Sequence, residues 1–198
     1  ESQSLLVEMQ LSRSQDFLAY ALPRIKEAFS ASGAAWDIAN IERLYLKVEP
    51  GFIRVDADEV TYPLHVILRY RLEKALLSGD LPVEDLPAAW NSGMRNTLGI
   101  TPPNDRLGCL QDIHWYDGAW GYFPTYTLGA MAAAQLFASA KAAVPEIPEA
   151  LGRGDFAPLM GWLNENVHAW GSFLSTDELL TRLTGHPLDP QVFKAHLK

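Results

Sequence analysis

Apolar side chains recur at intervals of three and four residues through most of this chain, and this spacing constrains the fold most. It is clearest from Asp58 to Leu77, where the apolar positions share one helical face and Gly79 is placed to end the helix. The stretch from Thr125 to Ala143 is rich in Ala and Gly, which let helices pack closely, and predicts a buried helix. The chain is therefore expected to be mainly α-helical.

Two stretches depart from this helical pattern. Residues 2 to 22 keep the period until Pro23, where we expect an interruption because proline lacks a backbone N–H. The run from Phe52 to Asp56 is β-prone without helical spacing, which predicts a minor, short β element. The other expected helices are one ending near Gly33, Asp37 to Lys47, Glu84 to Leu98, one after a capping box of Ser175 and Glu178 and ended by Gly185, and a last one opened by Asp189 and Pro190.

The composition is that of a globular protein, with 198 residues of which 48% are hydrophobic, and one compact domain over residues 1–198 is expected. The net charge of -8 argues against nucleic acid or an anionic membrane as partners, because phosphates bind clustered Lys and Arg. The single cysteine, Cys109, excludes an intrachain disulfide and favours the cytoplasm. No apolar run reaches the roughly 18 residues that a membrane span requires.

The start of the chain is unusual. Glu1 is not an initiator methionine, and no signal-peptide pattern follows it. Leu5, Leu6 and Met9 already show helical spacing, as if the chain began inside an element. We therefore expect the sequence to be a fragment of a longer protein.

Four short polar stretches are poorly explained as packing: Glu1 to Ser4, Ile53 to Tyr62, Gly108 to Trp115, and Pro124 to Tyr126. Their order and content resemble the thermostable (Taq-type) carboxypeptidase family of zinc metallopeptidases, which carries His-Glu-Ser-Gln, Ile-Arg-x-x-Ala-Asp-Glu-x-Thr-Tyr-x-x-His, Gln-Asp-x-His-Trp and Pro-Thr-Tyr in that order. The resemblance covers nearly the whole chain. It implies a mainly helical, gluzincin-like fold, with residues 1–198 as the C-terminal portion of a catalytic domain that removes the last residue of peptides with a free C-terminus.

The resemblance also implies a zinc site. In that family a His-Glu-x-x-His helix supplies two zinc ligands and the general base, and the glutamate of His-Glu-Ser-Gln supplies the third ligand, which corresponds to Glu1. No His-Glu-x-x-His occurs in this sequence. We therefore expect zinc in the intact enzyme, and weak zinc binding and no peptidase activity for this chain alone. Without the resemblance, Glu1 would be a solvated first-turn residue favoured by the helix dipole.

A carboxypeptidase must recognise a terminal carboxylate, and Arg does so best because its planar guanidinium makes paired hydrogen bonds. Arg54, between apolar neighbours, is the candidate; the alternative is a surface arginine paired with Asp56 or Glu59. His65 and Arg69 are four residues apart and share a helical face that could line the cleft. A structural histidine would give the same pattern at His65.

The stretch around Gln111 is expected to contribute both substrate binding and catalysis. Gln111 and Asp112 are candidates for substrate binding, and alternation would point Asp112 and His114 to the same side. A carboxylate can orient an imidazole that donates to the scissile carbonyl or its oxyanion, a catalytic role for His114. Tyr126 is the second catalytic candidate, through its phenol. Turn-stabilising hydrogen bonds and an ordinary core tyrosine are the alternatives.

Two other classes of function remain open on sequence grounds. The chain could be a non-catalytic helical interaction module, with the aromatic loop between residues 99 and 124 as its binding surface. Asp112 and His114 could instead serve an unrelated hydrolase, although no recognisable nucleophile motif accompanies them. The sequence leaves open whether the protein forms a homodimer.

Overall fold

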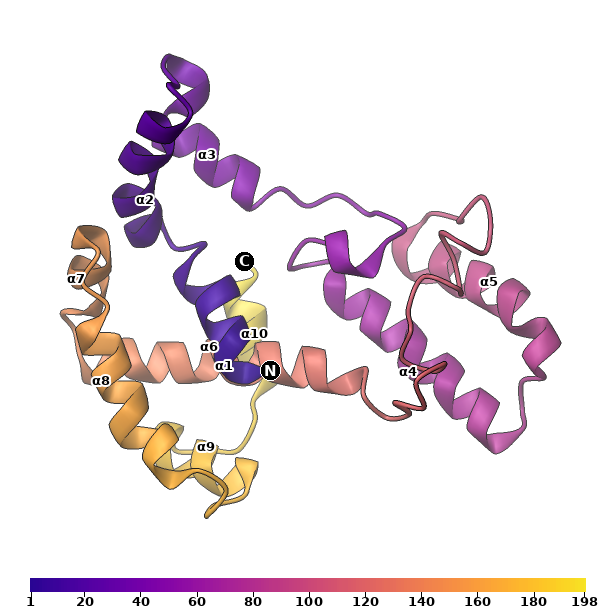
Figure 1. Cartoon of the computed structure of the whole chain (residues 1–198). Helices are drawn as coiled ribbons and strands as arrows, with labels where there is room; N and C mark the ends of the chain where they lie inside the picture. Colours follow the sequence, from indigo (N-terminus) through magenta and orange to yellow (C-terminus); the bar gives the residue numbers. More distant parts are fainter. The chain divides into compact units, whose positions relative to one another are not determined.

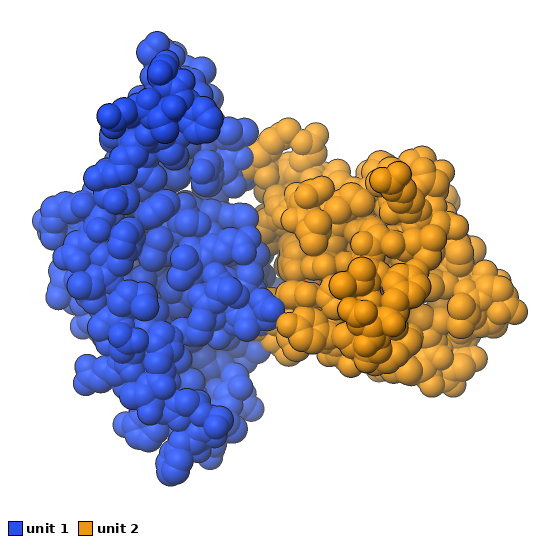
Figure 2. Space-filling model, viewed as in Figure 1, with its two compact units in different colours: residues 1–46, 129–198 blue, residues 47–128 orange.

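The computed structural model describes residues 1–198 as ten α-helices joined by turns and 3-10 segments, without strands, which confirms the mainly helical prediction. The chain forms two compact units (Figure 2). Unit 1 contains residues 1–46 and 129–198, and unit 2 contains residues 47–128. That one domain covers residues 1–198 stays a prediction, and the two units are described separately.

Unit 1 begins with a short helix α1 (Ser2–Leu5) that continues as a π-helix (Leu6–Leu11). The helix is interrupted after Leu11. Helix α2 (Gln15–Ala28) begins after Ser14, whose side chain accepts the Phe17 N–H. The prediction of an interruption at Pro23 was therefore wrong, because Pro23 lies inside α2. Helix α2 packs against α7, and tertiary packing can outweigh the local cost of a proline. Helix α3 (Ile38–Tyr45) follows.

The second part of unit 1 holds the main apolar core. Its central element is α6 (Pro124–Ala143) from Gly129 onward, whose small residues allow close packing. The predicted capping box at the start of α9 is present, and Gly185 ends that helix at φ 88°. Alone, none of the helices is long and apolar enough to cross a membrane; α6 and α7 reach that measure only as a pair bent by 100°. The remaining helices are α7 (Ile147–Arg153), α8 (Ala157–Asn166), α9 (Thr176–Thr184) and α10 (Pro190–His196).

Unit 2 is built on two helices that lie side by side, α4 (Tyr62–Ser78) and α5 (Leu86–Leu98) (Figure 1). Gly79 ends α4 in the left-handed conformation, as predicted. A short 3-10 segment (Val83–Asp85) leads into α5, and a long irregular loop, residues 99–123, leads to α6. The core between these elements contains Leu68, Leu72, Trp90, Met94, Leu98 and Cys109.

The short β element predicted from Phe52 to Asp56 is absent. Residues Arg54–Asp56 form a 3-10 turn instead. The Arg54 backbone N–H donates to the Gln111 side-chain oxygen over 2.8 Å, so a side chain takes the place of a neighbouring strand. The β-branched composition of this segment was outweighed by a contact distant in sequence.

Candidate active site

Residues from four segments of unit 2 meet around the Asp112 carboxylate. The 3-10 turn contributes Arg54, α4 contributes His65 and Arg69, and the first turn of α6 contributes Tyr126. The loop before α6 contributes Asp112 itself. The chain thereby brings together side chains as far apart in sequence as Arg54 and Tyr126, whose guanidinium and ring centroid lie 4.9 Å apart.

Asp112 lies between two arginines. Its Oδ1 accepts from Arg54 Nε at 3.0 Å and Nη2 at 2.7 Å, and its Oδ2 accepts from Arg69 Nε at 2.6 Å. Burial alone would raise the pKa of Asp112, but the charge of Arg69 and the hydrogen bonds from Arg54 outweigh it, so the pKa lies below its usual value. Asp112 is therefore an anion that orders both guanidinium groups.

Arg54 pairs with Asp112 and is 5% exposed, so it is not the surface arginine of the alternative interpretation. Burial lowers its pKa, but the Asp112 hydrogen bond and charge more than compensate and the pKa is raised. A third N–H, on Nη1, donates to the Tyr62 hydroxyl at 2.9 Å. Since a guanidinium has five N–H groups, two remain on Arg54.

His65 and Arg69 share a face of α4, as predicted, and both are fully buried. Arg69 Nη1 donates to the His65 carbonyl oxygen at 3.0 Å, and its guanidinium lies 4.6 Å from the Trp90 ring centroid. Burial, followed by the charge of Arg69, lowers the pKa of His65 to about 4, so this imidazole is neutral near pH 7. These contacts are internal to unit 2, and direct contact of either residue with a substrate stays a prediction.

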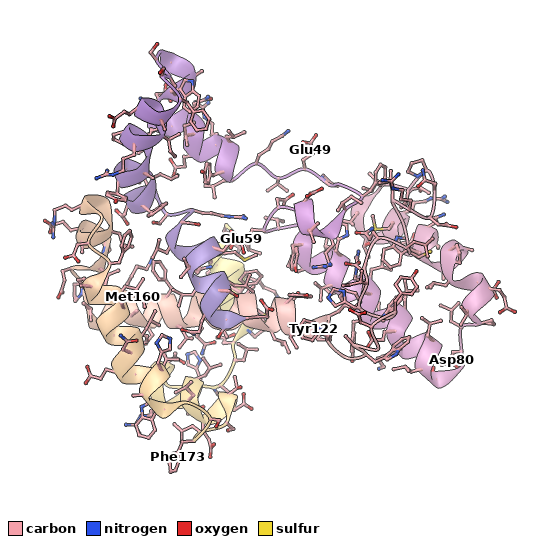
Figure 3. The ribbon with its side chains drawn as sticks, viewed as in Figure 1. Glu49, Glu59, Asp80, Tyr122, Met160 and Phe173 are labelled. Carbon is pink, nitrogen blue, oxygen red and sulfur yellow. The ribbon has the colours of Figure 1, made fainter.

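His114 and Tyr126 face each other. His114 Nε2 and the Tyr126 hydroxyl share a hydrogen bond of 2.8 Å, and His114 Nδ1 lies 3.9 Å from Asp112 Oδ1. The His114 ring centroid lies 4.3 Å from the Phe123 ring centroid and 5.7 Å from that of Tyr122. Tyr122 lies in the loop before α6 (Figure 3). Burial and then the charge of Arg54 lower the pKa of His114. A neutral imidazole paired with a phenol can hold or pass a proton.

Gln111 forms hydrogen bonds with the backbone around this site. Its Oε1 accepts the Arg54 N–H, and its Nε2 donates to the carbonyl oxygens of Phe52 at 3.0 Å, Gly108 at 3.1 Å and Leu107 at 3.2 Å. The amide thus binds the 3-10 turn to the loop that carries Asp112. A contact of Gln111 with substrate stays a prediction.

Glu73 is a buried residue of this region that the sequence analysis did not select. It is 4% exposed and accepts the indole N–H of Trp115 at 2.9 Å and the backbone N–H of Gly121. The available signal was its spacing, because His65, Arg69 and Glu73 recur every four residues and form a polar row on a packed face of α4.

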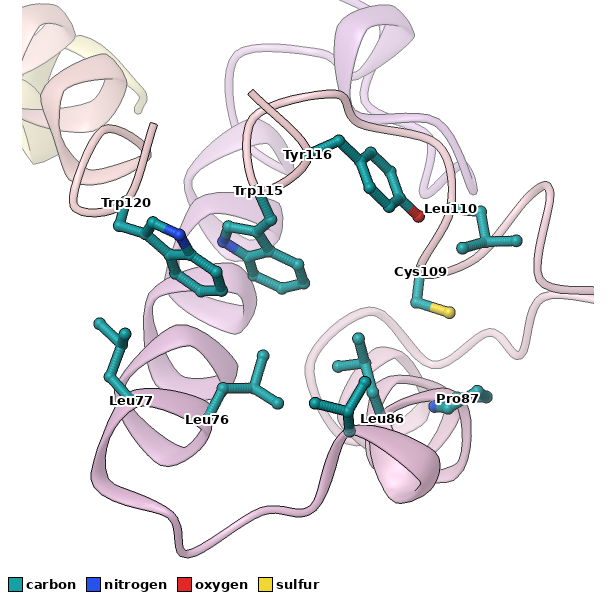
Figure 4. Close-up of a pocket in the computed structure, with 10 residues that line it drawn as sticks. Leu76, Leu77, Leu86, Pro87, Cys109, Leu110, Trp115, Tyr116 and Trp120 are labelled. Carbon is teal, nitrogen blue, oxygen red and sulfur yellow. The ribbon is translucent and has the colours of Figure 1, made fainter. Parts of the chain in front are cut away.

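Trp115 and Trp120 also line an apolar pocket of about 610 Å³ within unit 2 (Figure 4). Their rings stack at 5.8 Å with an interplanar angle of 11°. The end of α4, the start of α5 and the loop at Cys109 form the other walls. The long aromatic loop therefore shapes a pocket, and Trp115 connects that pocket to the segment carrying His114.

Glu1 belongs to unit 1, where it precedes α1. A Cβ on Gly129 would lie 2.8 Å from the Glu1 Cβ, so only glycine leaves room there. Gln3 Oε1 bonds His168 Nε2 at 2.8 Å, which links α1 to the 3-10 turn at His168–Trp170. No group of three or more His, Cys, Asp or Glu side chains is arranged to hold a metal ion. Glu1 is one hard oxygen donor, and these residues alone do not fit a catalytic metal, which takes about three protein ligands.

Solved structures with the same fold identify the class of protein. The chain superposes on the solved structure titled Trypanosoma Cruzi Metallocarboxypeptidase 1 with a TM-score of 0.93 and 43% identity, over 99% of this chain and 41% of that one. The fold is thus that of a helical metallocarboxypeptidase. The sequence matches the family described as carboxypeptidase Taq (M32) metallopeptidase over residues 1–198, and the chain belongs to this family.

Curated relatives agree with this assignment. Carboxypeptidase 1 of Bacillus subtilis (strain 168) is 42% identical over 189 residues, 96% of this chain and 38% of the relative. Thermostable carboxypeptidase 1 of Thermus thermophilus is 41% identical over 198 residues, 100% of this chain and 39% of the relative. The chain therefore spans about two fifths of the length of the curated relatives it matches.

Proposed function

We propose that this chain is the C-terminal part of a zinc-dependent metallocarboxypeptidase that hydrolyses the last peptide bond of substrates with a free C-terminus. The observation that carries the proposal is the 2.8 Å pairing of His114 with Tyr126 beside the Arg54–Asp112–Arg69 group. Family membership and the carboxypeptidase names of the relatives support the same reaction.

His114 and Tyr126 would act on the scissile carbonyl. With His114 neutral, Nε2–H donates to the phenol oxygen in one tautomer, and the phenol O–H would then donate to the carbonyl oxygen as negative charge develops there. Asp112 holds the positively charged groups next to this pair in place. Their fixed charges favour an anionic carbonyl oxygen without moving during the reaction.

Arg54 would bind the terminal carboxylate of the substrate through its two remaining N–H groups. Asp112 and Tyr62 hold the other three, which fixes the plane of the guanidinium before substrate arrives. Two arginines share the single charge of Asp112, so the group keeps an excess positive charge that suits an incoming anion.

Glu1 would be the zinc ligand that this chain contributes. Zinc, when bound, polarises the carbonyl and lowers the pKa of its water towards about 7. The other ligands and the general base would come from the remainder of the intact protein, so residues 1–198 alone are expected to bind zinc weakly and to be inactive. Stoichiometric, tight zinc at Glu1 of this chain alone would contradict that expectation.

The test is Tyr126→Phe in the intact protein, assayed on an N-blocked dipeptide with a free C-terminus. Loss of the phenol O–H should lower kcat by about 100-fold to 1000-fold, the usual effect of removing one oxyanion donor. Exposed Tyr116→Phe is the matched control and should keep wild-type rates. Wild-type kcat in Tyr126→Phe would exclude the proposed role, and an intact wild-type protein inactive on all C-terminal residues would exclude the function.

Arg54→Lys tests carboxylate binding separately, because lysine keeps the charge but loses the paired geometry. The free-acid peptide should be hydrolysed much less efficiently, whereas the C-terminally amidated peptide, a poor substrate already, should lose little. Equal fold losses on both peptides would assign Arg54 to the integrity of the Asp112 group instead.

A further inference from the structure

We propose that Glu73 is a positioning residue that sets the geometry of the His114–Tyr126 pair without touching either side chain. The inference rests on the carboxypeptidase function proposed above for its catalytic consequence. Its structural part concerns the carboxylate, the loop and the two rings, and can be tested in this chain alone.

The Glu73 carboxylate is buried, and N–H groups rather than a cation satisfy it. Oε2 accepts the Trp115 indole N–H at 2.9 Å, and Oε1 accepts the Gly121 backbone N–H. Hydrogen bonds to an ionised acceptor are roughly twice as strong as those between neutral groups. One side chain of the rigid helix α4 therefore holds two separate points of an irregular loop.

Those two points enclose the segment that shapes the site. Trp115 directly follows His114, and Gly121 directly precedes Tyr122 and Phe123. The Phe123 ring lies 4.3 Å from the His114 ring, and α6 begins one residue later, at Pro124, to present Tyr126. Because both points bind one carboxylate, the distance between the loop segment that carries His114 and the first turn of α6, which carries Tyr126, is fixed.

Few other bonds could do this. Within the turn, the Ala119 N–H donates to the His114 carbonyl oxygen at 2.8 Å and the Gly118 N–H to the Trp115 carbonyl oxygen at 3.2 Å. These bonds shape the turn internally. The Glu73 carboxylate adds hydrogen bonds from this turn to α4 to the apolar packing of Trp115, so its loss should let the turn shift and move His114 relative to Tyr126.

The first experiment uses this chain and needs no activity. In Glu73→Gln the side chain presents an oxygen at one of the two positions and an NH2 donor at the other, so one of the two N–H groups loses its acceptor. NMR should show an altered Trp115 indole N–H resonance and, two contacts away, altered His114 ring-nitrogen and Tyr126 ring resonances. Glu84→Gln, at an exposed carboxylate of the same unit, is the control and should leave all three unchanged. Unchanged His114 and Tyr126 signals in folded Glu73→Gln would overturn the proposal.

The second experiment uses the intact protein. Glu73→Gln should lower kcat by about 10-fold to 100-fold with KM within about twofold, because misplacing a catalytic group affects the transition state more than binding. Glu73→Asp keeps a carboxylate with a shorter reach; it should recover part of the loss and serves as the test if Glu73→Gln does not fold. A loss that follows only the folded fraction, or a wild-type kcat, would overturn the proposal. Inactive wild type with the expected NMR shifts would remove the proposed function while supporting the positioning by Glu73.

Discussion

Unit 2 keeps charged groups in its interior, whereas unit 1 keeps almost none. The buried charged residues are Arg54, Glu59, Arg69 and Glu73, all in unit 2, together with the neutral His65. The buried polar side chains of unit 1 are two uncharged glutamines, Gln10 and Gln135.

Buried polar side chains have different roles in the two units. In unit 1, Gln135 joins helices, since its Nε2 donates to Thr184 Oγ1 at 2.7 Å and its Oε1 accepts the Asp189 N–H at 2.9 Å. It supplements a large apolar core. In unit 2, buried charges cost desolvation that a smaller core must offset, and such groups persist mainly where they orient a site. Unit 1 is expected to respond to changes in volume and unit 2 to changes in charge.

The largest effect should follow Asp112→Asn in this chain. Removing the carboxylate leaves Arg54 and Arg69 buried without an anion, and breaking a buried ion pair costs about 3–5 kcal/mol. Urea unfolding measures the change. The control, Glu149→Gln, removes an exposed carboxylate paired with Arg153 and should produce no resolvable change. Similar small effects for both variants would erase the contrast between the units.

Acidification should destabilise unit 2 through His65. The folded pKa is about 4, below the ordinary 6.5, so between these values the unfolded chain binds a proton that the folded chain does not. The contribution of His65 to the free energy of unfolding is fully present above pH 6.5. It is lost as the pH decreases towards 4, by about 2–3 kcal/mol between pH 7 and pH 4.5. Asp112, with a lowered pKa, adds to the loss only in more acidic solution.

The measurement is urea unfolding at both pH values for wild type and His65→Gln. The substituted chain should lose less stability on acidification, because its side chain does not titrate, although it starts from a lower value. The charged groups around His65, namely Arg69, Arg54 and Asp112, are unchanged in both proteins. The same pH dependence in both would rule out His65 as the source.

A change of volume should dominate in unit 1. Gly129→Ala would place a Cβ 2.8 Å from the Glu1 Cβ and 3.2 Å from the Ser2 nitrogen, and overpacking of this kind costs about 1–3 kcal/mol. Gly161→Ala, in the interior of α8 with nothing within 4 Å, should instead stabilise by up to about 1 kcal/mol. Thermal unfolding of both variants gives the comparison. The same sign for both would show that space at Gly129 is not limiting.

The smallest effect is expected at the N-terminus of α9. Ser175→Ala removes the side chain that accepts the Glu178 N–H, and losing such a cap costs about 1 kcal/mol. Ser175→Thr keeps the oxygen and should cost a few tenths of a kcal/mol by the same scale. Hydrogen exchange of the first α9 amides reports the local loss, and equal exchange in the two variants would contradict it.

Local chemistry explains which helices could be predicted. The start and end of α9 were read from Ser175, Glu178 and Gly185, because capping depends on residues a few positions apart. Pro23 misled the prediction because tertiary packing outweighed its local cost. The 3-10 turn at Arg54 could not be anticipated, since the residue that binds its backbone, Gln111, is 57 positions away.

The candidate site divides in the same way. Motif order identified Asp112, His114 and Tyr126, which the structure brings together, but no local pattern indicated that Asp112 would pair with Arg54. The recurrence of His65, Arg69 and Glu73 every four residues was readable in advance as a polar row. What Arg69 and Glu73 bind could not be predicted, because their partners lie on the loop that folds against α4.

The pocket beside the two stacked tryptophans has a practical consequence for chemical labelling. Its wall includes Cys109, the single thiol of the chain, which is 6% exposed. Burial, followed by the charge of Asp105, raises the pKa of Cys109, so little thiolate is present near pH 7. A thiol reagent is therefore expected to react slowly with Cys109 while the wall keeps this conformation. The rate of alkylation therefore reports on conformational opening of the pocket. No probe has to be introduced, and no other cysteine contributes a background.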